Sequence, residues 1–270
     1  MSEGRWTALL LAGQRPGVDP LAEAFGETWK AKVRVDGEAM LSRVARTLLA
    51  VPHIERVIVM AQEPDQLFDA DCAWLADEPR VGTVRSSAGI ASSVAAVAGT
   101  EAAPWPVLVT TADHPLLTVP MIEAMIPDGA DADIAVGVVG RRTLLGAYPN
   151  NRRTWLKFAG GYWTGANLFA LTSERARSPL LAWSEVERDR KKAFKLIWHF
   201  GPWLAVRALT RTISLTSALA RAGNRLGAVV KPVDLRFPEA GIDVDKPSDH
   251  ALAELILSVR EDPSPDPGQR

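Results

Sequence analysis

A loop near the N-terminus contains residue types that bind phosphate groups. After the apolar run at 6–12, Gly13 and Gly17 let the backbone approach an anion closely, with amide groups pointing at it. Further along the chain, Lys30 or Lys32 could neutralise the charge of the phosphates. The spacing matches neither the dinucleotide pattern GxGxxG nor the P-loop pattern GxxxxGK followed by Ser or Thr, so both are excluded. On composition alone, a phosphate loop and a plain glycine turn fit equally well.

Three aspartates are placed where they could bind a hard cation. Asp113 lies at the end of the apolar run 106–115, and Asp243 and Asp245 alternate near the C-terminus. Side chains two residues apart on a strand share one face, so we expect this pair to point the same way. Carboxylates together with substrate phosphates are the usual ligands of Mg²⁺. The alternative is that Asp113 only ends a strand and that the pair lies in a solvated turn before a helix.

The elements that must position these residues alternate between strands and helices. Apolar runs of strand length lie at 6–13, 55–62, 80–86, 106–115, 132–140 and 226–235, and helical patterns lie at 38–51, after Gly89 and at 247–259. This alternation predicts an α/β fold with a mostly parallel sheet and helices on both faces, a Rossmann-like three-layer sandwich. Ligands of such sheets bind outside the carboxyl ends of the strands, where Gly13 and Asp113 fall.

Composition limits the classes of partner. Hydrophobic residues make up 47% of the chain, which supports a large buried core, and the 31 basic and 32 acidic residues nearly balance. Without a net basic charge we expect no nucleic-acid partner. We expect no transmembrane segment, because no run reaches the ~18 apolar residues of a membrane span. With a single cysteine, Cys72, the chain fits a reducing compartment, and we expect a cytoplasmic protein.

We expect one domain over 1–262, with a helical insertion at about 173–223, and a disordered tail at 263–270. The insertion carries Trp198 and Trp203 beside a basic cluster: Arg188, Arg190, Lys191, Lys192 and Lys195. Apolar and basic surface together suit a lid over a phosphorylated, lipid-related acceptor, or weak contact with a membrane surface. An ordinary helical cap or a homodimer surface is the alternative, and it is favoured because Gly201 and Pro202 interrupt the helix.

The order of these segments resembles the start of the MobA-like nucleotidyltransferases. LAG at 11–13, a Gly-rich loop and KAKVRVDGEAML at 30–41 follow the pattern of that family. Lys30 lies seven residues before Gly37, as the phosphate-binding lysine of the family does. The superfamily has a GT-A-like fold and includes molybdenum-cofactor guanylyltransferase, cobinamide-phosphate guanylyltransferases and cytidylyltransferases of isoprenoid synthesis. The resemblance therefore implies a GT-A/Rossmann-like fold.

The resemblance also implies roles for individual residues. Nucleotide binding falls on the loop and on the GIASSV segment: Leu11, Ala12, Gly13, Gln14, Arg15, Gly17, Lys30, Gly89 and Ser93. Asp113 in TTADHP would hold Mg²⁺ and act with Lys30 in catalysis, and Asn167 in GANLF would bind the acceptor. The segment IDVDKPSD is similar to the closing motif of the family, in which Asp243 and Asp245 would complete the metal site.

The function implied by the resemblance is Mg²⁺-dependent transfer of an NMP unit from an NTP to a small phosphorylated or hydroxylated acceptor, with release of pyrophosphate. One alternative is a GT-A glycosyltransferase, since D-x-D triplets begin at Asp69, Asp131 and Asp243. Another is a catalytically inactive nucleotide-binding regulator, because Gln14 replaces a loop glycine of the family and Val18 replaces its arginine. Retention of all the acidic positions favours an enzyme.

Overall fold

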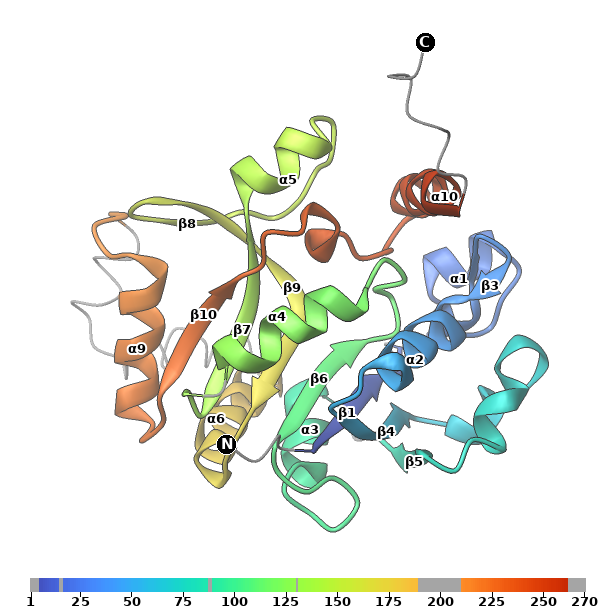
Figure 1. Ribbon diagram of the computed structural model, residues 1–270, viewed down its shortest axis with the longest axis horizontal. Helices are drawn as coiled ribbons and strands as arrows, with labels where there is room; N and C mark the ends of the chain where they lie inside the picture. Colours follow the sequence, from blue (N-terminus) through green and yellow to red (C-terminus); the bar gives the residue numbers. More distant parts are fainter. Residues whose placement is uncertain (1–4, 15–16, 87–88, 130, 189–209, 262–270) are drawn as a thin grey trace.

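Eight strands form one mixed sheet with helices on both faces (Figure 1). The computed structural model describes residues 5–14, 17–86, 89–129, 131–188 and 210–261. Its strands are β1 (Trp6–Leu11), β4 (Ile54–Ala61), β5 (Val81–Arg85), β6 (Val107–Thr111), β7 (Ile134–Gly140), β8 (Leu156–Phe158), β9 (Gly161–Leu171) and β10 (Val230–Asp234). They lie in the order β10-β7-β9-β6-β1-β4-β5, and β8 pairs with β9 outside this path. A hairpin of β2 (Arg34–Val35) and β3 (Glu38–Ala39) forms a separate small sheet.

The helices divide into two layers because alternate residues of each buried strand face opposite sides. In β1, Ala8 and Leu10 belong to one core cluster, whereas Leu9 belongs to the other. The first core is covered by α2 (Met40–Ala50), α4 (Val119–Gly129) and α10 (Pro247–Glu261), and the second by α3 (Ile90–Val97), α6 (Arg177–Arg188) and α9 (Leu215–Arg225). Figure 1 shows α2 and α4 in front of the sheet, with α3 and α6 behind it. The three-layer prediction is confirmed.

The remaining described helices are short. They are α1 (Pro20–Ala24), α5 (Arg141–Ala147), η1 (Lys30–Lys32), η2 (Pro64–Gln66), η3 (Ala70–Ala76), η4 (Glu174–Ala176) and η5 (Pro238–Gly241). Among them, η1 and η5 matter most for the site, because η1 begins at Lys30 and η5 leads into the segment that carries Asp243 and Asp245.

The sheet is mostly parallel, as predicted, but its centre is not. β9 lies between β6 and β7 and runs antiparallel to both. The sequence predicts no strand there, because two glycines interrupt the apolar pattern in GYWTGANLFAL. In the structure many of these residues are only half-buried. The strand expected at Asp243–Asp245 is wrong: this stretch is an extended connection, in which the Val244 amide donates to the Asp113 carbonyl oxygen at 2.8 Å.

A bulge in β9 turns one side chain out of the strand pattern. The pairing with β7 shifts between Val136 and Val138, and at the shift Asn167 has a φ of 48°. This left-handed conformation is uncommon outside glycine, although asparagine tolerates it better than most residues. The opposite strand has Gly137 here, where an added Cβ would lie 2.9 Å from the carbonyl oxygen of Leu168. The bulge therefore depends on a close backbone approach at Gly137.

The described parts of the predicted insertion belong to the second helix layer. Leu180 of α6 and Leu219 of α9 pack against the second core. Several residues of this prediction lie outside the described part of the chain: Trp198, Trp203, the basic residues from Arg190 to Lys195, and the tail at 263–270. The side chain of Arg188 is likewise outside the described part. The acceptor lid, the membrane-surface contact and the homodimer surface therefore stay predictions.

We predict that Gly137→Ala destabilises the fold by about 1–3 kcal/mol, because the new methyl group must displace the Leu168 carbonyl. Gly146→Ala is the matched control, since an added Cβ there meets nothing within 4 Å and alanine suits a helix. The measurement is the free energy of unfolding in denaturant. Equal stability of the two variants would contradict the assignment of Gly137 to the bulge.

Candidate active site

The candidate site lies where β1 and β6 end at the same edge of the sheet. Asp113 follows β6, and Gly13 follows β1, its parallel neighbour. The bond from the Val244 amide to the Asp113 carbonyl brings the C-terminal connection to this edge. Residues separated by more than a hundred positions in the sequence thus meet at the place where α/β sheets bind ligands.

Lys30 joins the aspartates of this edge. Its Nζ donates to Asp113 Oδ2 at 2.6 Å and also contacts Asp245 Oδ1. Burial lowers the pKa of Lys30, but Asp113 and Asp245 together raise it by more, so the net pKa lies above its ordinary value and the ammonium stays charged. Lys32 points elsewhere and pairs with Asp69 at 2.5 Å. Of the two candidate lysines, the structure brings only Lys30 to the aspartates.

Gln14 fixes the backbone from which Lys30 extends. Its side-chain amide donates to the Thr28 carbonyl oxygen, and its Oε1 accepts a hydrogen bond from the Lys30 amide, both at 3.0 Å. Glutamine at this position departs from the pattern that the sequence resembles, which has glycine. Here the longer side chain connects the glycine loop to η1, a contact that glycine could not make.

A second glutamine closes the loop from the other side. Gln62, just after β4, accepts from the Gln14 amide at 3.2 Å and donates to the Gln14 carbonyl oxygen at 2.8 Å. An added Cβ at Gly13 would lie 2.9 Å from Gln62 Oε1, so the two hydrogen bonds between Gln62 and Gln14 require glycine at position 13. Gln62 could not be singled out from the sequence, because nothing in the chain order pairs it with Gln14.

The other predicted loop residues have varied placements. Backbone atoms of Leu11 and Ala12 extend the sheet, since the Leu11 carbonyl accepts from Ala112 and the Ala12 amide donates to Met60. Gly17 has a φ of 102°, which suits glycine in a turn. Arg15 lies outside the described residues. Their roles in nucleotide binding stay predictions.

One oxygen of Asp113 is left without a partner. Oδ1 is buried and accepts no hydrogen bond from the described residues, whereas Oδ2 pairs with Lys30. A buried carboxylate oxygen needs a partner, and a cation is one that would suit it. In the described part of the chain no three His, Cys, Asp or Glu residues gather as a complete metal site. Two carboxylates plus the phosphates of a substrate are nevertheless a usual Mg²⁺ environment.

Asp243 has different partners from Asp245. Arg153 contacts Asp243 Oδ1 and donates to its carbonyl oxygen at 2.8 Å, and the Asn167 side chain donates to Asp243 Oδ2 at 3.0 Å. Burial raises the pKa of Asp243, and the nearby Asp245 and Asp113 raise it further, while Arg153 lowers it. Both carboxylate oxygens of Asp243 are therefore engaged by protein groups.

Arg153 was not singled out from the sequence. It lies in the loop between α5 and β8, and it also contacts Asp249 in α10, at 3.7 Å. An arginine in an exposed-looking stretch such as NRRTW carries no signal of burial, yet its side chain is only 9% exposed. The predicted acceptor ligand Asn167 is thus part of a polar network with Arg153 and Asp243.

The predicted base- and ribose-binding segment lies at the start of α3. Gly89 precedes the helix, and Ser93 is buried with its hydroxyl donating to the Gly89 carbonyl oxygen at 2.6 Å. Glu187 of α6 accepts from the Ala91 amide at 3.0 Å, a favourable place for a carboxylate at a helix N-terminus. At the other end of α3, Arg177 donates to backbone carbonyls. Helix α6 therefore holds both ends of α3.

His114 lies beside Asp113 and is buried. Its Nε2 donates to the Glu239 carbonyl oxygen at 3.4 Å, and its Nδ1 has no partner among the described residues. Burial lowers the pKa of His114 from 6.5 to about 4, although Glu239 and Asp113 act in the opposite direction. The ring is therefore neutral at pH 7, next to the carboxylate that meets Lys30.

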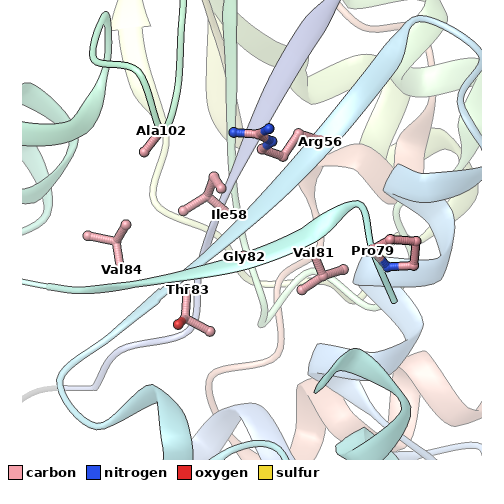
Figure 2. A pocket seen from close by; sticks show the side chains of 8 residues that line it. All are labelled: Arg56, Ile58, Pro79, Val81, Gly82, Thr83, Val84 and Ala102. Carbon is pink, nitrogen blue, oxygen red and sulfur yellow. The ribbon is translucent and has the colours of Figure 1, made fainter. Parts of the chain in front are cut away.

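A separate pocket lies on the outer strands, β4 and β5, and on loops near their amino ends (Figure 2). Its lining residues are Arg56, Ile58, Pro79, Val81, Gly82, Thr83, Val84 and Ala102. None of them is a predicted site residue, and the lining contains no carboxylate. The pocket is therefore not the place where Lys30 and Asp113 act.

Comparison with known proteins supports a family assignment. The model of the MobA-like NTP transferase domain matches residues 8–199. A hypothetical transferase structure from Thermus thermophilus is 26% identical, covers 91% of this chain and 99% of its own, and superposes with a TM-score of 0.74. No curated protein matched. Among the described residues, no helix has both the length and the apolar character needed to cross a membrane.

Two further structures share the fold at lower identity. The 2-C-methyl-D-erythritol 4-phosphate cytidylyltransferase from Thermus thermophilus is 15% identical over 94% of this chain and all of its own, with a TM-score of 0.51. The 4-diphosphocytidyl-2C-methyl-D-erythritol synthase from Anaerococcus prevotii is 12% identical over 95% of this chain and all of its own, with a TM-score of 0.55.

We predict that Gln14→Ala loosens η1. Loss of the two hydrogen bonds should lower the free energy of unfolding by about 1–2 kcal/mol and speed hydrogen exchange at the Lys30 amide. Gln66→Ala, at an exposed position in η2, is the control and should change neither quantity. Unchanged exchange at Lys30 in the Gln14 variant would show that the contact does not hold η1.

We also predict an acid-sensitive contribution from His114. Because its pKa is lowered to about 4, the unfolded chain takes up this proton first as the pH falls, and stability is lost between about pH 6.5 and pH 4. The loss is at most about 1.4 kcal/mol per pH unit. In His114→Gln the dependence of unfolding free energy on pH should be shallower over this interval. Parallel curves for the two proteins would rule out the buried neutral ring.

Proposed function

Because the chain belongs to the MobA-like NTP transferase family and is a nucleotidyltransferase, we propose that it moves an NMP group from an NTP to a small acceptor. The acceptor is phosphorylated or hydroxylated, pyrophosphate is released, and Mg²⁺ is required. The absence of a net basic charge favours a small-molecule acceptor over a nucleic acid. We place the reaction in the cytoplasm, a reducing compartment that suits the buried free thiol of Cys72.

The observation that carries the proposal is the meeting of Lys30, Asp113 and Asp245 at the carboxyl ends of the strands. Nucleotidyl transfer puts negative charge on the α-phosphate oxygens and on the leaving pyrophosphate, and it needs little beyond alignment and charge neutralisation. Lys30, whose backbone amide is held by Gln14, can contact the phosphates. Carboxylates beside it can hold the cation.

Asp113 and Asp245 are the residues that we propose to hold Mg²⁺, which would neutralise phosphate charge when bound. The unpartnered Oδ1 of Asp113 supports this role, and Asp245 is the proposed second ligand because both carboxylates contact the same ammonium group. Asp243 is less suited, since Arg153 and Asn167 already engage both of its oxygens.

The network of Arg153, Asp243 and Asn167 is proposed to border the acceptor. Asn167 is held in a left-handed conformation by the bulge of β9, and such strained residues occur often at ligand sites. Arg153 adds a guanidinium, which suits a phosphate or hydroxyl group on the acceptor.

The family match favours nucleotidyl transfer over a glycosyltransferase or an inactive regulator. Of the three D-x-D triplets, only the one of Asp243 and Asp245 lies at the site. Asp131 instead pairs with Lys231 at the start of β10, and Asp69 pairs with Lys32. A glycosyltransferase releases a nucleotide rather than pyrophosphate, so the product distinguishes these classes directly.

We predict that GTP, CTP, UTP or ATP, each supplied with Mg²⁺, raises the melting temperature of the protein for at least one base. With that NTP and a panel of sugar phosphates and phosphorylated alcohols, pyrophosphate should be released in step with formation of an NMP-linked product. Asp113→Asn and Asp245→Asn should lower the rate about 100-fold or more, because each removes charge beside the cation.

Asp131→Asn is the matched control, since it alters a D-x-D triplet away from the site and should leave turnover unchanged. Release of a nucleoside diphosphate from a sugar-nucleotide donor, without pyrophosphate, would overturn the proposal. Near-native turnover of Asp113→Asn at limiting Mg²⁺ would remove Asp113 from the metal site.

A further inference from the structure

The ammonium group of Lys30 lies on the carboxylates to which we assign the metal. It is 2.6 Å from Asp113 Oδ2 and also contacts Asp245 Oδ1. The Lys30 side chain is 15% exposed and that of Asp113 is 21% exposed, so the pair is largely shielded from water. A divalent cation bound by Asp113 and Asp245 would lie beside this ammonium group.

We propose that Lys30 and the divalent cation compete for Asp113 and Asp245, so that metal binds well only together with an NTP whose phosphates draw the lysine away. The inference rests on the proposed function, since it uses the metal and phosphate sites assigned there. It adds a property of this chain: metal and nucleotide bind with positive coupling through one side chain.

Electrostatics explains why the two cations exclude each other. Like charges that lie close together repel each other, and the cost in free energy is larger at a partly buried site, where water screens them less. A divalent ion beside the ammonium would double that cost. The lysine must therefore move for the metal to bind.

Asp113 is held in place and Asp245 is free to adjust, which makes it feasible for the metal to replace the lysine. The backbone carbonyl of Asp113 accepts from Val244, and its side chain is mostly enclosed, whereas the Asp245 side chain is 59% exposed. Gln14 holds the Lys30 amide but not its ammonium, so the long side chain can turn toward a polyphosphate while η1 stays in place. The phosphates then give the ammonium a new anionic partner and bring the metal with them.

The test is Mn²⁺ binding measured by electron paramagnetic resonance, with and without the NTP identified by the melting-temperature screen. We expect the wild-type protein to bind Mn²⁺ weakly by itself. Lys30→Met keeps the length of the side chain but removes its charge, and it should bind Mn²⁺ alone at least about tenfold more tightly. The same variant should bind the NTP more weakly, so the two affinities change in opposite directions.

Lys32→Met is the matched control, because Lys32 is equally enclosed, at 17% exposed, but pairs with Asp69. It should leave the affinities for Mn²⁺ and for NTP unchanged. The double variant Lys30→Met with Asp113→Asn should lose the gained Mn²⁺ affinity, which locates the ion at Asp113. Circular dichroism of every variant establishes that the fold is retained.

Each other outcome overturns the inference. Equal Mn²⁺ affinity of the wild-type and Lys30→Met proteins, with or without NTP, would show that the lysine does not exclude the metal. A parallel loss of both affinities in Lys30→Met would indicate a structural role only. Failure of the proposed function would be recognised separately, since then no NTP would support release of pyrophosphate whatever the behaviour of Mn²⁺.

Discussion

The site depends on the ion pairs that Lys30 makes with Asp113 and Asp245. Partly buried charges are tolerated only when each has a close partner of opposite sign, because they lose much of their hydration. This requirement joins an N-terminal loop, the end of β6 and a connection near the C-terminus. Polar contacts around these ion pairs help to hold them in place, since Gln14 bonds to the backbone of Lys30 and Val244 bonds to that of Asp113.

The sheet positions the ion pairs of Lys30 and divides the site into two sides. Parallel strands β1 and β6 end together, which puts the glycine loop beside Asp113. The antiparallel strand β9, inserted between β6 and β7, brings Asn167 to Asp243 through its bulge. One side is thus built by the N-terminal half of the chain together with Asp245. The other side is built by β9, the loop with Arg153 and the final connection.

The described helices between β9 and β10, α6 and α9, pack against the second core of the sheet. Helix α6 covers one face of the sheet and holds α3 at both ends, through Glu187 and Arg177. The family match spans residues 8–199 and therefore does not include Asp243 or Asp245. The contacts with Lys30, Arg153 and Asn167 are what place them beside the other candidate residues in the structure.

Local sequence determined the elements whose pattern is strong, and with them the class of fold. Buried parallel strands read as continuous apolar runs, so β1, β4 and β6 could be predicted, and Asp113 could be placed at a strand end. The resemblance to the family pattern, in which the lysine lies seven residues before Gly37, likewise favoured Lys30 over Lys32. The pairing of Lys30 with Asp113 and of Lys32 with Asp69 shows that the two side chains point to different places. Tertiary structure decided the rest. Strand β9 is half-exposed and bulged, so it lacks a periodic signal, and the segment with Asp243 bonds to the Asp113 backbone instead of a neighbouring strand. Hydrogen bonds join each of three further residues to a partner at least 48 positions away in the sequence: Arg153, Gln62 and Glu187. A contact of that kind leaves no trace in local spacing, because it exists only once the sheet has brought the two segments together.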